Sequence, residues 1–363
     1  MSELFSPLAL GPLTLRNRIV VAPMCQYSSE DGQATDWHII HLGHLALSGA
    51  GMLVIEATAV EPQGRISPAD MGLWSEKQQT ALGRVLSSVR TYACLPIVVQ
   101  LAHAGRKAST AKPWDGGAQI SVAEGGWPTE APSPLPYAAE EQAPLELAAT
   151  GLDRIEAAFV AAAKRADALG LAGVEVHCAH GYLLHQFLSP LSNHRTDDYG
   201  GSLENRLRFP LRIIAAVRAA VPETRLLGVR ISATDWVPGG WNIDDSVVLA
   251  RRIKALGCDY IHVSSGGLSP DQQIPVGPGY QVPFAERIRR ETGLPTVAVG
   301  LITEPAQAEA IIASGQADAV ALARGMLYDP RWPWHAAAAL GAQVDAPPQY
   351  LRCQPHGLKG LFR

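Results

Sequence analysis

The sequence has few cysteines and no long apolar run. Its five cysteines among 363 residues form no Cys-x-x-Cys pair, which argues against a disulfide framework and against an iron–sulfur cluster, since a cluster needs several thiolates close together. No stretch reaches the roughly 20 apolar residues of a membrane span, and residues 1–15 lack the pattern of a signal peptide. We therefore expect free thiols in a reducing cytoplasm and no membrane partner.

An excess of charge of one sign is also missing. Lysine and arginine number 30 against 34 aspartates and glutamates, a net charge of −4, which gives no basis for a nucleic-acid partner. A glycine-rich dinucleotide fingerprint is absent as well, because the first expected strand, residues 19–22, runs into Pro23-Met24-Cys25. An open dinucleotide-binding sheet is therefore disfavoured.

What the chain does contain is a regular alternation of short apolar strands and helices. A hairpin around Gly11-Pro12 precedes eight expected strands, which cover residues 19–22, 52–60, 96–102, 173–177, 226–232, 260–264, 296–299 and 319–323. This alternation, without two separable halves, predicts one α/β domain over residues 1–363, a (β/α)₈ TIM barrel. Residues 104–149, rich in Gly, Pro, Ser and Trp, are too long for a plain connection and are expected to cap the site.

The most informative stretch is Val174–Leu184, in which an apolar strand ends on two histidines and a tyrosine. His177, His180 and Tyr182 need only a short turn to face one cavity. Two imidazoles can hold an oxygen that gains negative charge, and a phenol can deliver a proton. Paired histidines also bind zinc or serve structure. We expect Glu175 to face away from His177 and not to complete a metal site, but this stretch alone leaves the alternatives open.

Active sites of such barrels lie at the carboxyl ends of the strands. Two arginines, an amide, the histidine pair and glycine-bearing turns after the last strands suggest a phosphorylated cofactor there. For Arg324 the alternative is a salt bridge that closes the barrel. The residues expected at the strand ends are Pro23, Cys25, Ala57, Gln100, His177, His180, Arg230, Gly300, Ala323 and Arg324.

Several motifs resemble those of the old yellow enzymes, specifically the branch of xenobiotic reductases and thermophilic-like ene-reductases, which is marked by Cys25 and Tyr27. The resemblance spans nearly the whole chain. Its motifs are Pro23-Met24-Cys25-Gln26-Tyr27, Glu56-Ala57-Thr58-Ala59-Val60, the runs 100–107, 177–183 and 193–202, Val229-Arg230-Ile231-Ser232 and Ala323-Arg324.

The resemblance implies an NADPH dehydrogenase that carries FMN, takes hydride from NADPH or NADH, and reduces the C=C bond of enones, with nitro compounds as further substrates. Cys25 is implied to lie near the reactive edge of the flavin and tune its potential, and Arg230 to lie beside the electron-rich N1–O2 end. The residues implied to contact FMN are Ala22, Pro23, Met24, Cys25, Ala57, Gln100, Arg230, Gly300, Ala323 and Arg324.

On the substrate side, the resemblance implies that His177 and His180 hold the carbonyl oxygen. Tyr182 is implied to donate the proton, and Tyr27 to close over the substrate. Arg352 resembles an arginine that reaches into the neighbouring subunit, which implies a homodimer or a dimer of dimers with residues 345–363 at the interface. The apolar surface expected to find a partner consists of Trp332, Pro333, Trp334, Tyr350 and Phe362.

His38, His41 and His44 recur every third residue. Successive steps of three rotate away from a single helix face, and no carboxylate completes a site, so we interpret them as helix packing and solvent contact without metal.

The alternative function is a phosphate-binding lyase or isomerase without flavin that uses a histidine base. Cluster-containing dienoyl reductases need a cysteine cluster and a further flavin domain, for which this sequence gives no sign.

Overall fold

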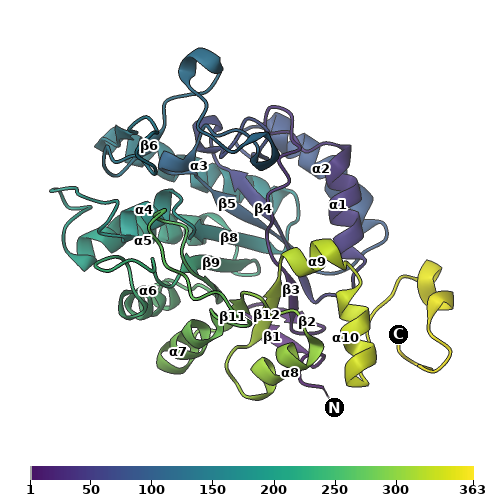
Figure 1. Cartoon of the computed structure of the whole chain (residues 1–363). Helices are drawn as coiled ribbons and strands as arrows, with labels where there is room; N and C mark the ends of the chain where they lie inside the picture. The colour runs from purple at the N-terminus through teal and green to yellow at the C-terminus, as the bar shows by residue number, and fades with distance from the viewer. Residues whose placement is uncertain (1) are drawn as a thin grey trace.

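Eight parallel strands close into a barrel at the centre of the computed structural model, which describes residues 2–363 (Figure 1). The predicted TIM barrel is confirmed, and the expected strands differ from the observed ones by no more than one residue at either end. β3 pairs with both β12 and β4 and so completes the ring. The strands are β3 (Ile19–Val21), β4 (Met52–Ala59), β5 (Ile97–Ala102), β8 (Gly173–Cys178), β9 (Leu226–Ser232), β10 (Tyr260–Ser264), β11 (Thr296–Val299) and β12 (Ala319–Leu322).

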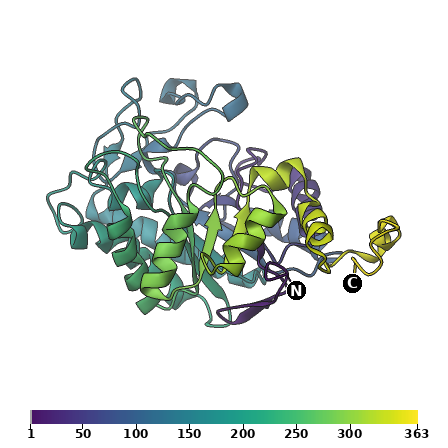
Figure 2. The same ribbon diagram turned by 60° about the horizontal axis from the view of Figure 1, so that its bottom comes forward.

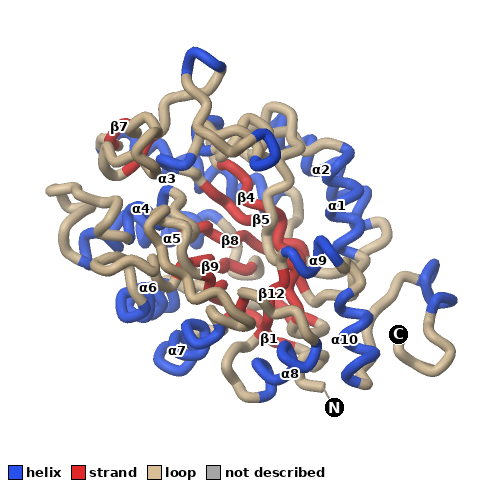
Figure 3. Tube along the Cα trace, in the orientation of Figure 1, coloured by secondary structure: helices blue, strands red, loops and turns tan. Residues whose placement is uncertain are grey.

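Helices surround the strands on the outside, as the blue and red tubes of Figure 3 show. Side chains that accept backbone N–H groups begin several of them, for example Ser75, Ser202 and Asn242. None of the helices in residues 2–363 combines the length and the apolar character needed to cross a membrane. The helices are α1 (Asp36–Ala46), α2 (Glu76–Arg90), α3 (Ala149–Ala168), α4 (Leu183–Leu188), α5 (Leu203–Ala220), α6 (Ile243–Ala255), α7 (Val282–Thr292), α8 (Pro305–Ala313), α9 (Arg324–Tyr328) and α10 (Trp332–Leu340).

The amino ends of the strands are closed by an apolar plug. The expected hairpin forms as β1 (Leu8–Leu10) and β2 (Leu13–Leu15), and Figure 2 shows it below the barrel. Its leucines pack against inward-facing residues such as Val20, Met52 and Tyr260. Because this end is filled with apolar side chains, the polar chemistry of the interior collects at the carboxyl ends.

The long segment after β5 folds without any long helix. It contains the short 3₁₀ turns Gly105–Lys107, Pro113–Asp115 and Val122–Glu124 and the paired strands β6 (Glu130–Ala131) and β7 (Leu145–Glu146). Side chains of this segment, including Lys107 and Tyr137, line a cavity of about 360 Å³ together with Tyr27 from the loop after β3. The segment therefore supplies most of the lining of this cavity, and Tyr27 and Ile66 from other loops complete it.

The chain end packs on its own α10. Trp334 is buried with Val344 and Leu361, and its ring lies 4.8 Å from that of Phe362. Trp332 is also buried and donates to the Thr303 carbonyl at 2.7 Å. The expectation that these tryptophans offer apolar surface to a partner is therefore wrong, because both pack against other residues of the same chain.

One ion-pair network ties the start of the long segment to α3. The Glu61 carboxylate lies 3.0 Å from His103 Nε2 and 3.0 Å from Arg154 Nε, and Arg154 also contacts Glu130. Glu61, His103 and Glu130 are metal-ligand types, but Arg154 occupies both carboxylates, so the group is an ion-pair network. Burial would raise the pKa of Glu61, yet His103 and Arg154 outweigh it and lower that pKa to about 2.

We predict that Glu61→Gln lowers the free energy of unfolding by about 2 kcal/mol at pH 7, since a buried charged hydrogen-bond acceptor is lost. The folded pKa lies below the ordinary value of 4.5, so this stabilisation is present above pH 4.5 and is lost as the pH falls toward 2. Urea titrations across that range measure it. Glu140→Gln, an exposed change in the same segment, serves as the control, and an equal pH dependence in both variants would contradict the assignment.

Candidate active site

The carboxyl end of β8 places the first histidine inside the barrel. His177 is buried and stands in register with Arg230 on β9. Glu175, two residues earlier, contacts Gln100 at 2.7 Å and His262 at 3.2 Å, so it also points inward. The expectation that Glu175 faces away from His177 is wrong, because side chains two residues apart in a strand share a face.

Beyond β8 the chain turns sharply at His180 and Gly181, whose φ angles are 56° and 75°. The turn brings His180 Nδ1 to 3.5 Å from His177 Nε2. The rings of His177 and Tyr182 lie 5.0 Å apart in an edge-on arrangement. The three side chains singled out from the sequence are therefore adjacent in space.

Burial controls the protonation of this group. Desolvation, followed by the charge of Arg230, lowers the pKa of His177 and of His180 well below the ordinary value of 6.5. Desolvation raises the pKa of Tyr182 well above its ordinary value of 10.0. Near neutral pH the site thus contains two uncharged imidazoles and a protonated phenol, which are all hydrogen-bond donors.

Lys107 lies beside the histidine turn. Its ammonium donates to the carbonyls of His180 at 3.0 Å and Gly267 at 2.9 Å, and it lies 5.2 Å from the centre of the Tyr182 ring. Burial lowers the pKa of Lys107 to about 8. The amine is therefore held against the site and not in solvent.

The loop after β3 carries Cys25 and Tyr27. Burial, followed by the charge of Asp70, raises the pKa of the Cys25 thiol well above its ordinary value, so the thiol stays protonated. The backbone of Tyr27 has a φ of 50°, and its ring packs edge-on against Trp114 of the long segment at 5.8 Å. The loop thereby connects the barrel rim to the segment that lines the cavity.

A buried histidine–carboxylate pair holds this loop. Glu56 on β4 accepts the Gln26 N–H at 2.8 Å and lies 3.3 Å from His38 Nε2. His38 is fully buried and accepts the Thr35 N–H at 2.9 Å through Nδ1. His38 is thus buried, as helix packing predicts, but the expectation that no carboxylate accompanies it is wrong, because Glu56 of β4 lies beside it.

A belt of buried polar side chains crosses the barrel below the histidines. Glu175 accepts from Gln100 Nε2 and from the Tyr260 hydroxyl, the latter at 3.1 Å, and pairs with His262. Desolvation lowers the pKa of Arg230, while the charge of Glu175 opposes that shift. Four strands thus contribute to one charged layer.

Sequence reasoning found Gln100 and Arg230 in this belt but missed Glu175, Tyr260 and His262. The signal was available in the two-residue alternation of each strand, because a polar residue that shares a face with buried valines points into the barrel. Which strands would meet could not be read from that alternation alone, since cross-strand register depends on how the barrel closes.

Turns after β11 and β12 stand at the same rim. Gly300 has a φ of 123°, and a Cβ there would come 2.5 Å from Gln281 Nε2, so only glycine fits. Gln281 itself donates to the Val299 carbonyl at 2.8 Å and accepts from Ser265 at 2.6 Å. Ala323 precedes α9, which begins at the exposed Arg324. Among residues 2–363 no barrel-closing ion pair of Arg324 is present.

The remaining predicted residues divide into two groups. Ala22 is buried at the end of β3, ahead of the partly buried Pro23 and Met24, and Ala57 stands opposite Gln100 after a register shift in β4. Arg352, in contrast, is exposed in the 3₁₀ segment Pro348–Cys353. Figures 1 and 2 both show that tail beyond α10, at the periphery of the molecule, so a chain does not bring its own Arg352 to its own site.

Comparisons with known proteins agree with this architecture. Residues 3–343 match the model of the NADH:flavin oxidoreductase / NADH oxidase family. NADPH dehydrogenase of Geobacillus sp. (strain WCH70) is 46% identical over 351 residues, 96% of this chain and 98% of that protein. NADPH dehydrogenase of Listeria innocua is 44% identical over 356 residues, 97% and 99% of the two chains.

Two solved structures show the same fold. Morphinone reductase in complex with tetrahydroNAD superposes with a TM-score of 0.77 at 28% identity, covering 96% of this chain and 94% of that one. A 2-naphthoyl-CoA reductase complex reaches 0.83 at 25% identity over 94% of this chain. The chain spans about half the length of that second protein, 52%.

The barrel and these relatives define a flavin-dependent oxidoreductase. In particular, the chain belongs to the NADH:flavin oxidoreductase / NADH oxidase family, and its structural neighbours include old yellow enzyme relatives such as morphinone reductase. Its cofactor is FMN and its hydride donor is NAD(P)H. The alternative of a flavin-free lyase or isomerase does not fit this membership.

Residues at the rim fit the cofactor. Arg230 is buried, and its Nε has no hydrogen-bond partner among residues 2–363. A buried cation with a free donor is suited to bind an anionic ligand. Gln100 donates an amide N–H to Glu175, and its amide oxygen remains available as an acceptor. The bare glycine backbone at Gly300 leaves room beside the turn.

We predict that Glu175→Gln raises the midpoint potential of bound FMN by about 30 mV, equivalent to ~1.4 kcal/mol for a two-electron couple. The buried negative charge near Arg230 disappears, so the arginine charge stabilises the reduced, more anionic cofactor to a greater extent. Potentiometric titration with FMN content as a parallel readout measures the shift. The exposed change Glu223→Gln is the control, and an unchanged potential in a fully loaded Glu175→Gln variant would contradict the role.

Proposed function

We propose that this chain is an ene-reductase that reduces the C=C bond of α,β-unsaturated carbonyl compounds. The observation that carries this proposal is the pair of neutral imidazoles, His177 and His180, with facing nitrogens 3.5 Å apart beside the protonated Tyr182. When bound, FMN supplies the hydride that it has received from NAD(P)H. The protein residues then have to hold the carbonyl oxygen and supply a proton.

The two histidines are suited to hold that oxygen. Reduction of an enone at its β-carbon places negative charge on the carbonyl oxygen, and donors already in position lower the barrier. His177 Nδ1 accepts the Ala179 N–H at 3.2 Å, which leaves the proton on Nε2. We assign the proton of His180 to Nδ1, with the Ser264 hydroxyl donating to His180 Nε2 at 2.8 Å rather than to Gln281 Oε1 at 3.3 Å. Both N–H groups then face the same point.

Tyr182 is assigned the proton donation. Its raised pKa keeps the phenol protonated over the physiological range, and Lys107 above the ring stabilises the negative charge that develops as the proton leaves. The tyrosine follows directly on the strained turn, so its position relative to the histidines is fixed by the backbone. The alkene carbon next to the carbonyl would receive this proton.

On the cofactor side, Ala22, Pro23, Met24, Cys25 and Ala57 are proposed to line the flavin. We assign Cys25 a tuning role, because its raised pKa keeps the thiol neutral and a neutral thiol is a poor nucleophile. Phosphate is assigned to the rim residues Gly300, Ala323 and Arg324, since barrels commonly bind phosphate at the turns after the last two strands. Gln100 and Arg230 would meet the polar end of the ring.

Substrate entry is assigned to the cavity between the barrel loops and the long segment. Tyr27, Lys107 and Tyr137 line its 360 Å³, a size suited to a small enone, and nitro compounds present a similar polar oxygen. The tetrahydroNAD complex of morphinone reductase supports the same site as the place where the nicotinamide enters in turn. Five free thiols suit a reducing compartment, and we place the enzyme in the cytoplasm.

The histidine assignment predicts that His177→Ala with His180→Ala leaves FMN bound but reduces turnover of cyclohexenone by at least about 10²-fold, because removing one oxyanion donor has that effect. Phenols, which imitate the charged oxygen, should also lose their long-wavelength band with the flavin. Stopped-flow absorbance and phenol titrations measure both. His194→Ala changes an exposed histidine and is the control. Retention of both band and turnover in the double variant would overturn the assignment.

We also propose a homodimer, or a dimer of dimers, in which Arg352 enters the partner's site. Apolar side chains remain exposed near this end of the chain: Leu327, Tyr328, Tyr350 and Leu351, with Tyr328 94% exposed. Large apolar side chains exposed near one another in this way commonly mark an interface when a partner covers them. Arg331 packs on Tyr350 at 5.3 Å and holds the tail beside α10.

Arg352→Ala tests the shared site without removing Phe362 from its packing on α10. We expect KM for cyclohexenone to rise about tenfold, the effect of losing one charged hydrogen bond of ~1.4 kcal/mol, with FMN content and thermal midpoint unchanged. Arg363→Ala, at the neighbouring chain end, is the control. Sedimentation that shows a fully active monomer at micromolar concentration would contradict the proposal.

A further inference from the structure

All four polar backbone atoms of the His180–Gly181 turn are bound by side chains. The N–H of His180 donates to Ser232 at 2.9 Å, and its carbonyl accepts from Lys107 at 3.0 Å. The N–H of Gly181 donates to His185 at 2.9 Å, and its carbonyl accepts from Gln186 at 2.7 Å. The turn positions two of the proposed catalytic side chains, and a side chain forms a hydrogen bond to each N–H and carbonyl of its two residues.

This turn needs such support because its backbone is strained. A non-glycine residue such as His180 adopts a φ of 56° only at a cost of order 1–3 kcal/mol. Gly181 cannot be replaced, since a Cβ there would lie 2.1 Å from the Gly267 carbonyl. Released from its partners, the turn would relax, and His180 and Tyr182 would move with it.

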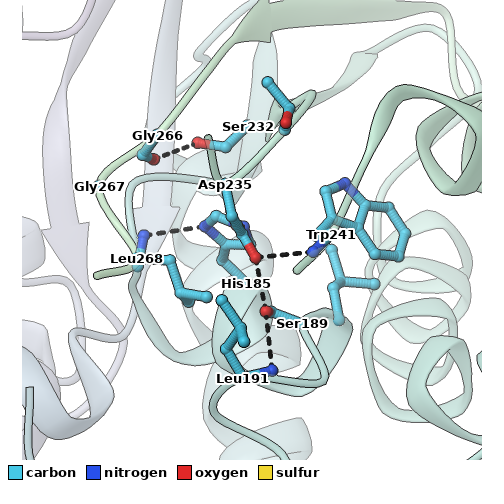
Figure 4. Close-up of polar contacts among 12 residues, drawn as sticks. His185, Ser189, Leu191, Ser232, Asp235, Trp241, Gly266, Gly267 and Leu268 are labelled. Carbon is cyan, nitrogen blue, oxygen red and sulfur yellow. Dashed lines mark hydrogen bonds and ion pairs between the residues drawn. The ribbon is translucent and has the colours of Figure 1, made fainter. Parts of the chain in front are cut away.

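His185 is the member of this set that depends on its proton. It is fully buried on α4, its Nδ1 accepts the Gly181 N–H, and its Nε2 lies 2.9 Å from Asp235 Oδ1 (Figure 4). Nε2 and Oδ1 form no hydrogen bond with any described residue, so their 2.9 Å contact is an ion-pair contact and neither atom is held by another group. The second oxygen of Asp235 accepts from Ser189 at 2.6 Å and from the Trp241 N–H at 2.8 Å, which fixes the carboxylate.

A neutral imidazole has one N–H and one acceptor nitrogen. Because Asp235 can only accept, it selects the tautomer with the proton on Nε2, and Nδ1 is then free to accept from Gly181. Opposite protonation would set an Nδ1–H against the Gly181 N–H. We propose that His185 is a positioning residue, locked in its Nε2–H tautomer by Asp235, which holds the His180–Tyr182 turn in its working geometry; this inference rests on the proposed ene-reductase function.

Two other loops of this site use the same arrangement. His38 accepts the Thr35 N–H through Nδ1 while Nε2 faces Glu56. His103 accepts the Gly105 N–H at 3.0 Å while Nε2 faces Glu61. The pair formed by His185 and Asp235 is thus one of three that hold rim loops, and it is the one that adjoins the proposed proton donor.

Asp235→Asn tests the tautomer. The amide oxygen can replace the carboxylate oxygen toward Ser189 and Trp241, which turns the NH₂ group toward His185 Nε2 and favours the Nδ1–H form. In protein labelled with ¹⁵N-histidine, NMR shifts should show Nε2–H in the wild type and Nδ1–H in the variant. We expect kcat for cyclohexenone to fall about 10²-fold, as for a misplacement of the reacting groups, with FMN still bound and phenol affinity reduced.

A second pair of variants separates position from stability. His185→Phe and His185→Asn both remove the partner of Asp235, but only the asparagine retains an acceptor near the place of Nδ1. The asparagine variant should keep at least tenfold more activity than the phenylalanine variant. Asp329→Asn, which alters the exposed pair of Asp329 and His335, is the control.

Each outcome decides the inference. Equal activity of the two His185 variants, or an Asp235→Asn protein with an unchanged tautomer, would overturn it, as would a changed tautomer with unchanged kcat and phenol affinity. A wild-type protein that holds FMN but does not reduce cyclohexenone would instead refute the proposed function, while the tautomer measurement and the phenol titration would still report on the clamp.

Discussion

Closure of the barrel through β3 is the constraint on which the rest of the structure depends. This short strand pairs with β12 on one side and β4 on the other, and only then do the carboxyl ends of all eight strands form one rim. Residues between positions 22 and 324, from stretches that are far apart in the sequence, are thereby gathered at one rim. The hairpin fills the opposite end of the barrel with leucines. Polar side chains inside the barrel can therefore contact a ligand only at the carboxyl ends of the strands.

Histidine serves two distinct purposes at that rim. His177 and His180 face the site with nitrogens that are available to a ligand. The other three, His38, His103 and His185, have both nitrogens occupied: one lies beside a carboxylate and the other accepts a backbone N–H. Burial keeps the first pair neutral, and the carboxylates order the second set. The same type of side chain thus provides both the proposed substrate-binding groups and the contacts that hold the loops behind them.

Much of this could be predicted from the sequence, because apolar runs with two-residue alternation and helix caps determine local structure. Strand bounds, the hairpin and the adjacency of His177, His180 and Tyr182 follow from such local patterns. The belt of Glu175, Tyr260 and His262 does not, since its contacts depend on register between strands far apart in the chain. Burial of Trp332 and Trp334 could not be predicted from local patterns either, because Trp332 bonds to Thr303 far earlier in the chain and Trp334 packs on residues of the chain end.

Anchoring of the long segment after β5 has a consequence for how such an enzyme can diversify. The segment is fixed at its base by the pairing of Glu61, His103 and Arg154, while its tip carries exposed residues such as Trp114 and Val122. Insertions, deletions or substitutions at the tip can change the lining of the cavity that we propose as the substrate entry, without altering the strands beneath. Substrate range and barrel stability are therefore encoded in separate stretches of the chain, and evolution or a designer can alter the first while leaving the second intact.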